Sequence, residues 1–269
     1  MEKDIIEYYI QGKTGNIDDL EDAIVVTKDF YAVIDGVTSK FPVKYQKKTA
    51  GRYCAELLKS AIESLPRDID VNCALELLDK TVSLAYEGGE ITAENKMQAS
   101  VIIYSKARRE VWSYGDCQLM INDTVYDHKK AIDKTLENLR ALTILTYLNE
   151  GGERESLFEN DIGRESIMPY LKKQSQFANA DGYFGYGVID GCGINKSHIK
   201  VYTVEKGDNV ILASDGYPRL FKTLEESEKY LKEALENDPL CICENMQTKM
   251  KSQGNASFDD RSYLSFTVE

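Results

Sequence analysis

The sequence is poor in the residues that build the commonest zinc and nucleophilic sites. Its 269 residues include only two histidines, His128 and His198, and its six cysteines form no CxxC pair. The sequence therefore offers almost no ligands for a zinc site of the two-histidine type. The cysteines are expected to be small buried residues or bystanders in a reducing compartment.

The chain also lacks a basic excess and long apolar runs. Lysine and arginine number 33 against 45 acidic residues, a net charge of −12. This balance disfavours a nucleic-acid partner, because few basic groups are available to release counterions from a phosphate backbone. No apolar run approaches the ~20 residues that span a bilayer, and the charged start at residues 1–4 lacks the apolar centre of a signal peptide. We expect a cytoplasmic protein with no nucleic-acid partner and no membrane partner.

The overall composition is that of a globular protein. Hydrophobic residues make up 42% and charged residues 29% of the chain, which argues against disorder. With 18 glycines and 5 prolines, no segment looks like a linker, so we expect one domain over residues 1–269. The acidic excess is consistent with solubility alone, or with binding of divalent cations if the carboxylates converge.

Strand-like runs cluster along the chain instead of alternating one for one with helices. Strands are predicted at residues 22–27, 30–34, 100–105, 110–114, 118–121, 124–126, 199–204, 209–214 and 262–268, and helices at 50–65, 74–85, 132–145 and from 223 to about 236. The short polar connectors between 100 and 126 predict an antiparallel meander. This grouping favours an α+β fold with antiparallel sheets covered by helices. The polar segment at about 150–180, with a helix candidate at 168–173, is a candidate flap subdomain.

Two apolar strands each deliver an aspartate followed by glycine, at Asp35-Gly36 and Asp215-Gly216. A carboxylate at the end of a buried strand is costly unless a cation or a donor compensates it. The glycine lets the backbone turn, so that its carbonyl can also face a bound ion. Because two other Asp–Gly pairs occur in the chain, simple turn closure is the alternative interpretation.

Further carboxylates lie at predicted strand edges. Glu21-Asp22 precedes one strand, Asp116 lies between two strands, and Asp259-Asp260 precedes the last strand. Oxygen ligands with almost no histidine or cysteine select a hard cation such as Mg²⁺ or Mn²⁺. The alternative is that the acidic run at residues 18–22 is a solvated face.

The order of these motifs resembles one known family. The motifs are Glu21-Asp22, Tyr31-Ala-Val-Ile-Asp35-Gly36, Gln98-Ala-Ser-Val-Ile, Tyr114-Gly-Asp116-Cys-Gln, Asp127-His128, Asn209-Val-Ile-Leu-Ala-Ser-Asp215-Gly216 and Asp260-Arg-Ser-Tyr-Leu. From about residue 10 to the end, this succession is similar to that of the metal-dependent protein serine/threonine phosphatases, the PPM or type 2C family. The run Leu-Ala-Ser-Asp-Gly is the most diagnostic piece.

The resemblance implies a four-layer fold, with a central antiparallel β-sandwich flanked by helices on both faces, and a cleft that holds two Mg²⁺ or Mn²⁺ ions. It implies that Asp35 bridges the ions with the Gly36 carbonyl on one of them, that Asp215 and Asp260 ligate the other, and that Glu21 and Asp22 hold metal-bound waters. A water between the ions would then attack the phosphorus of phosphoserine or phosphothreonine in a protein substrate, with no covalent intermediate. Asp35, Asp215 and Asp260 would thus be catalytic through this water.

Several positions depart from the family pattern. Val37 stands where many members have a histidine that is suggested as general acid, which leaves water or Lys40 for that role. Ile17 stands where the family usually has a phosphate-binding arginine. Lys13 is a candidate substitute, or simply a solvated lysine.

The third metal of some family members is doubtful here. Asp116 matches one of its ligands, but Arg219 stands where an aspartate often completes that site. The final motif is Asp260-Arg261 in place of the usual Asp-Asn, which keeps the ligand but changes its neighbour. These losses leave a second hypothesis open, namely a phosphatase-like binding or regulatory module that is weakly active or inactive.

Overall fold

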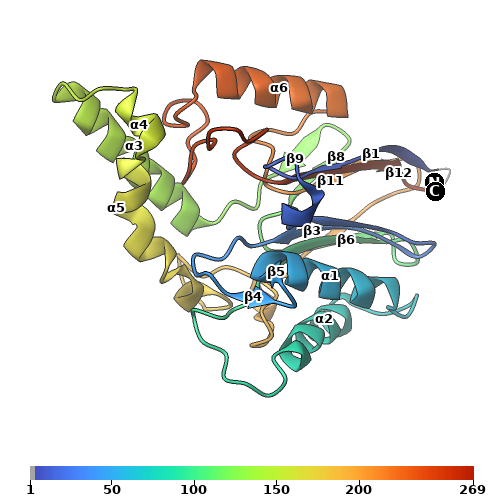
Figure 1. The fold of residues 1–269 in the computed structure, drawn as a ribbon. Coiled ribbons are helices and arrows are strands. Elements are labelled where there is room, and N and C mark those ends of the chain that lie inside the picture. Colours follow the sequence, from blue (N-terminus) through green and yellow to red (C-terminus); the bar gives the residue numbers. More distant parts are fainter. Residues whose placement is uncertain (1–3) are drawn as a thin grey trace.

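Two antiparallel sheets packed face to face form the centre of the molecule (Figure 1). The computed structural model describes residues 4–269. Helix α6 (Leu224–Asn237) covers the outer face of one sheet, and α1 (Ala50–Glu63) and α2 (Val71–Ala85) cover the outer face of the other. The chain therefore has the predicted α+β architecture, a sandwich between helical layers.

Each large sheet has five strands. The first has the order β1-β12-β11-β8-β9 and comprises β1 (Ile5–Gln11), β12 (Arg261–Thr267), β11 (Asn209–Ala213), β8 (Gln118–Ile121) and β9 (Thr124–Tyr126). The second has the order β10-β7-β6-β3-β2 and comprises β10 (Lys200–Thr203), β7 (Glu110–Tyr114), β6 (Ala99–Ser105), β3 (Phe30–Gly36) and β2 (Ala23–Val26). A small hairpin of β4 (Lys44–Tyr45) and β5 (Lys48–Thr49) precedes α1.

Strand β3 shows why the sheets stack in this way. Successive side chains of a strand point to opposite faces. In β3, Tyr31 and Val33 join the core between the two sheets, whereas Ala32 and Ile34 join the core beneath α1 and α2. Both faces of this strand are covered, which explains its continuous apolar run.

The helices begin where the sequence provides caps. The Thr49 side chain accepts a hydrogen bond from the backbone of Arg52 at the start of α1, and Asp70 caps α2. Thr223 accepts from the backbone N–H of Glu226 at the start of α6, as a capping sequence predicts. The buried face of α1, with Cys54, Leu58 and Ile62, packs on the sheet that contains β3.

The meander predicted over residues 100–126 is wrong. Strands β6 and β7 pair with each other, as do β8 and β9, but the two pairs belong to different sheets. The chain crosses between the sheets at Gly115, whose φ of +115° favours glycine. A Cβ atom there would also lie 2.3 Å from the Ser100 hydroxyl oxygen. This crossing sets Asp116 between the layers.

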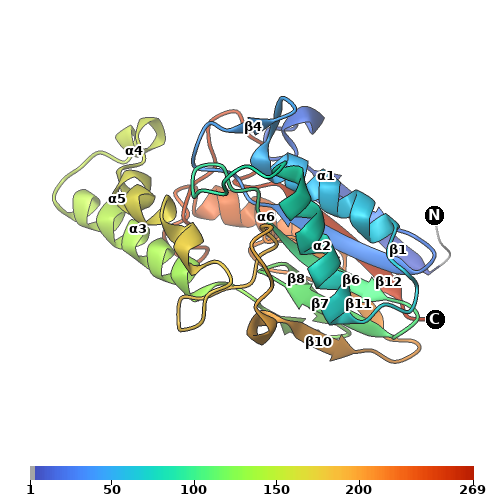
Figure 2. The same cartoon turned by 90° about the horizontal axis from the view of Figure 1, so that it is seen from below.

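Three helices form an arm at one end of the sandwich (Figures 1 and 2). The helical arm comprises α3 (Ala131–Asn149), α4 (Ser156–Glu159) and α5 (Ile162–Leu171). The buried Arg140 of α3 holds it together, because its guanidinium pairs with Asp161 at 2.7 Å and donates to the carbonyls of Cys241 and Gln247. The segment 150–180 thus contains α4 and α5, and α5 overlaps the helix candidate at 168–173 over residues 168–171.

Within residues 4–269, no helix combines the length and the apolar character that crossing a bilayer would need.

Candidate functional site

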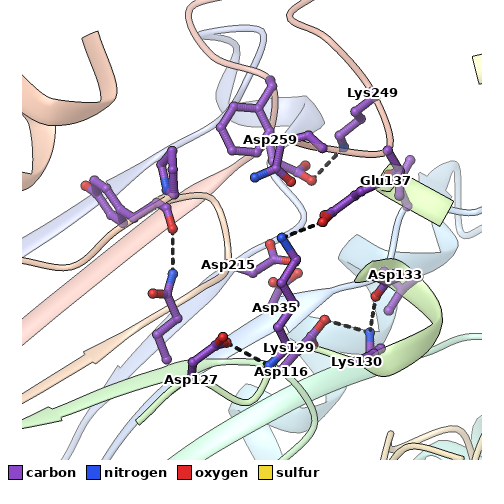
Figure 3. A pocket seen from close by; sticks show the side chains of 18 of the residues that line it. Asp35, Asp116, Asp127, Lys129, Lys130, Asp133, Glu137, Asp215, Lys249 and Asp259 are labelled. Carbon is purple, nitrogen blue, oxygen red and sulfur yellow. Dashed lines mark hydrogen bonds and ion pairs between the residues drawn. The ribbon is translucent and has the colours of Figure 1, made fainter. Parts of the chain in front are cut away.

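Within residues 4–269, five aspartates at or near strand ends line one cavity of about 360 Å³ (Figure 3). Asp35 is the last residue but one of β3. Asp116 lies between β7 and β8, Asp127 directly after β9, Asp215 two residues after β11, and Asp259 two residues before β12. Because β3 belongs to one sheet and β11 to the other, the sandwich itself brings Asp35 and Asp215 together. This is the convergence that the two Asp–Gly motifs predict.

Asp35 and Asp215 lie next to each other in the cavity (Figure 3). Asp35 is partly covered and Asp215 is open to the cavity. Desolvation by the cavity walls raises the pKa of both groups well above the usual range. Nearby carboxylates raise the pKa further, chiefly that of Asp22 for Asp35 and that of Asp35 for Asp215. Two neighbouring carboxylates of this kind can bind a cation.

The glycines that follow these aspartates are required for close packing of the backbone. A Cβ atom on Gly36 would lie 2.5 Å from the carbonyl oxygens of both Glu21 and Gly51, and one on Gly216 would lie 1.9 Å from the Asp260 carbonyl oxygen. Gly36 is still a residue of β3 and pairs with β6, so it does not close a turn. The Asp–Gly motif therefore marks positions where other segments approach the site.

Glu21 and Asp22 lie behind the cavity and do not line it. The Glu21 Oε2 atom accepts hydrogen bonds from the Thr38 hydroxyl and from the Lys13 ammonium. Its other oxygen, Oε1, is buried and has no hydrogen-bond partner among residues 4–269. Asp22 is buried and accepts a hydrogen bond of 2.8 Å from the Ser262 hydroxyl.

The two acidic residues before β12, Asp259 and Asp260, have different surroundings. Asp260 is buried and accepts backbone N–H hydrogen bonds of 2.7 Å from Lys13 and Glu21; it is not among the residues that line the cavity. Its neighbour Asp259 lines the cavity and pairs with Lys249 at 2.6 Å (Figure 3). Burial raises the pKa of Asp259, but Lys249 and Lys13 outweigh it and lower the pKa to about 2. The sequence analysis named both residues as an acidic cluster and, from the family resemblance, selected Asp260 as the metal ligand.

Lys13 is held by three carboxylates. Its ammonium lies 3.1 Å from Glu21, 3.4 Å from Asp259 and 3.7 Å from Asp260. The lysine side chain is 17% exposed, so it is not the solvated lysine of the alternative interpretation. Burial lowers its pKa, but the surrounding carboxylates raise it above the ordinary value overall. The contacts place Lys13 beside the cavity, tied into its wall.

Asp116 already has a cationic partner. The ammonium of Lys130 lies 2.7 Å from Asp116 and 3.9 Å from Asp133 (Figure 3). Both side chains of the Lys130–Asp116 pair are nearly buried, at 10% and 9% exposure. Burial raises the pKa of Asp116, but the Lys130 charge outweighs it and lowers the pKa. Sequence reasoning missed Lys130, whose only signal is its place at the start of a predicted helix.

The residues around Asp35 and Asp215 fit a metal ion, whereas the surroundings of Asp116 do not. Within residues 4–269, no three Asp, Glu, His or Cys side chains lie close enough together to hold an ion by themselves. Magnesium, however, is usually bound by only one or two carboxylates and several waters. Two features are therefore compatible with bound Mg²⁺ or Mn²⁺. The carboxylates of Asp35 and Asp215 lie together, and Glu21 Oε1 has no hydrogen-bond partner among residues 4–269. Asp116, paired with Lys130, does not fit a third ion.

No protein-family model matches the chain, nor does any curated protein sequence. Solved structures do match it. The serine/threonine phosphatase of S. agalactiae aligns with a TM-score of 0.50 at 12% identity over 98% of each chain. Serine/threonine phosphatase Stp1 from Staphylococcus aureus has a TM-score of 0.49 at 11% identity, covering 98% of this chain and 94% of its own. The catalytic domain of phosphatase PstP, solved with 2 manganese ions, has a TM-score of 0.49 at 13% identity, covering 98% of this chain and 99% of its own. The likeness to the S. agalactiae structure confirms that the chain has the fold of a serine/threonine phosphatase, as the motif order predicts.

Proposed function

We propose that this protein is a metal-dependent phosphatase that hydrolyses phosphoserine or phosphothreonine in protein substrates. The observation that carries the proposal is the meeting of Asp35 and Asp215, from opposite sheets, in one cavity. The fold shared with the S. agalactiae serine/threonine phosphatase supports the reaction class.

Asp35 and Asp215 would hold two Mg²⁺ or Mn²⁺ ions together with the Gly36 carbonyl. We assign the remaining carboxylate ligand to Asp259, because it lines the cavity whereas Asp260 is engaged by two backbone N–H groups. Bound there, the ions would supply a water activated for in-line attack on phosphorus and would neutralise the phosphoryl oxygens. The cavity contains no histidine, and this chemistry requires none.

The other acidic residues position this centre. Asp260 holds the backbone of Lys13 and Glu21 at the cavity wall. The free oxygen of Glu21 and the carboxyl of Asp22 lie behind Asp35, where they would orient water molecules. Asp116 is neutralised by Lys130 and is not free to ligate a third ion, so the proposal includes two ions only.

Hydrolysis of an aryl phosphate and of a phosphothreonine peptide, with added Mn²⁺ and then with excess chelator, tests the proposal. We expect turnover that needs Mn²⁺ and that falls at least a hundredfold in Asp215→Asn and Asp259→Asn. The matched control is Asp181→Asn, an exposed aspartate of another Asp–Gly pair. Turnover that survives complete chelation, or an Asp215→Asn protein as active as the wild type, would refute the proposal.

Calorimetric titration with Mn²⁺ separates the alternative from the proposal. A wild-type protein that binds Mn²⁺ but turns over neither substrate would be a phosphatase-like binding module. The same titration on Asp259→Asn and Asp260→Asn decides between these neighbours, because only loss of a direct ligand should lower the number of ions bound.

A further inference from the structure

Three cationic side chains from distant segments meet on one side of the cavity. Lys40 lies in the loop after β3, Arg164 in the first turn of α5, and Lys249 in the loop before β12. All three line the same cavity as the aspartates. The Arg164 guanidinium donates a 2.8 Å hydrogen bond to the carbonyl of Thr248, which fixes the helical arm against the segment that carries Lys249.

These cations are incompletely balanced by carboxylates. Lys249 pairs with Asp259 at 2.6 Å. The Lys40 ammonium and the Arg164 guanidinium donate to backbone carbonyls, and among residues 4–269 neither lies within 4.0 Å of a carboxylate oxygen. All three side chains are at least partly buried. A neutral carbonyl cannot offset the charge of a desolvated cation, so the cluster keeps an unmet preference for an anion.

The neighbouring like charges affect the pKa of Lys40. Burial lowers the pKa of this ammonium to about 8, and the charges of Lys249 and Arg164 contribute to the shift. Like charges held together in this way raise the local affinity for an anion. By contrast, two other lysines that line the cavity are neutralised, since Lys130 pairs with Asp116 and Lys129 with Glu137.

We propose that Lys40, Arg164 and Lys249 form an anion subsite that binds a second acidic group of the phosphoprotein substrate, next to the phosphoryl group that reacts. The proposal rests on the proposed function and adds a substrate class, phosphopeptides with a neighbouring carboxylate or second phosphate. A cavity of about 360 Å³ has the size of small-molecule sites and can admit both groups. The arginine fork suits either kind of anion.

Three phosphothreonine peptides test the subsite. They share one sequence and carry alanine, glutamate or phosphoserine at the positions flanking the phosphothreonine. For the wild type with Mn²⁺ we expect kcat/KM to be about tenfold higher for an acidic peptide than for the alanine peptide, mainly through KM, as one charge-assisted contact would give. Comparison of the glutamate and phosphoserine peptides identifies which anion is preferred.

Variants from two segments keep the test independent of folding defects. In Arg164→Met and Lys40→Met, the acidic-to-alanine ratio should fall towards one, whereas Arg164→Lys should retain most of it. The matched control is Arg154→Met, an exposed arginine of the same arm, which should keep the wild-type ratio. Thermal melts identify any variant that has simply unfolded.

Binding of the same labelled peptides in chelator, followed by fluorescence anisotropy, gives a readout without turnover. If the wild type hydrolyses no peptide with Mn²⁺, the proposed function fails, and the ratio of dissociation constants then decides on the subsite. A wild-type ratio near one in both assays overturns the subsite. So does an Arg164→Met protein that loses as much on the alanine peptide as on the acidic peptides.

Discussion

From the pairing of Lys130 with Asp116 we predict that the Lys130 ammonium group stabilises the folded protein. Replacing Lys130 by methionine keeps the length of the side chain and removes its charge. Asp116 would then be left nearly buried, near the carboxylates of Asp35 and Asp215, while the Ser100 hydroxyl still donates a hydrogen bond to it. Breaking a buried pair by removing one partner costs about 3–5 kcal/mol.

Protonation sets an upper bound on this loss. At pH 7 a stranded Asp116 can take up a proton at a cost of roughly 4 kcal/mol, which is the distance from its ordinary pKa converted to free energy. We therefore expect Lys130→Met to lower the free energy of unfolding by about 3–4 kcal/mol in chelator. With an unfolding entropy of about 2.1 cal/mol/K per residue over 269 residues, the melting temperature should fall by roughly 5–7 °C.

Two further variants make the prediction refutable. Lys130→Met/Asp116→Asn removes the stranded charge and should recover most of the loss. Lys134→Met, an exposed lysine of the same helix, should change stability by less than ~0.5 kcal/mol. Urea denaturation in chelator measures all three proteins. A loss below ~1 kcal/mol in Lys130→Met, or a double variant no more stable than the single one, would refute the reasoning.

Manganese provides a second readout of the same pair. If the ammonium stands where a cation is needed, Lys130→Met should gain more stability from Mn²⁺ than the wild type does. The extra gain is about 1.4 kcal/mol at ten times the dissociation constant of the new site. Equal responses of the two proteins to Mn²⁺ would show that Asp116 does not accept a metal ion when its lysine is absent.

Three other variants probe the charges around the site. Asp215→Asn removes one of two neighbouring carboxylates and with it roughly 1–2 kcal/mol of solvent-screened repulsion, so in chelator its melting temperature should rise by about 2–4 °C. In scanning fluorimetry, Mn²⁺ should raise the melting temperature of this variant less than that of the wild type. An equal rise would contradict the assignment of Asp215 as a ligand. Lys13→Met removes the ammonium that three carboxylates share and should lose about 3 kcal/mol in urea denaturation. The 86% exposed Lys28→Met should lose almost nothing; equal losses in the two variants would contradict this prediction. Burial raises the pKa of Glu137 to about 7, above its unfolded value, so the wild type should lose about 2–3 kcal/mol of stability as pH rises from about 4.5 to 7. Glu137→Gln should lack this loss when both proteins are denatured in urea at pH 5 and pH 8, and identical pH dependences would disprove the prediction.

Much of the fold follows from local patterns. The apolar stripe of α1 and the capping sequence before α6 predict helices that the structure contains. The split of residues 100–126 between two sheets did not follow, because β7 and β8 look like consecutive strands of one meander. Strand β1 was also missed, since its apolar residues (Ile5, Ile6, Tyr8, Tyr9 and Ile10) do not alternate as a half-buried strand would.

The choice between Asp259 and Asp260 shows the limit of motif reading at a site. Both residues fit a final acidic motif, but neighbours at the start of a strand point in opposite directions. The pairing of β12 with β11 fixes that register, with Tyr263 opposite Ala213. The register leaves Asp259 on the cavity side and turns Asp260 towards the backbone of Glu21.

The sequence by itself determined most of the segments that form strands and helices, because periodicity is a local property. It also showed that two apolar strands end in aspartates suited to a hard cation, because residue chemistry is local too. Only the tertiary structure decided which cations neutralise which acids. Lys130, Lys40, Arg164 and Lys249 reach the cavity from segments that meet only when the helical arm packs against the end of the sandwich. The Coulomb energy of a pair depends on its separation in space and on burial, and neither is set by distance along the chain.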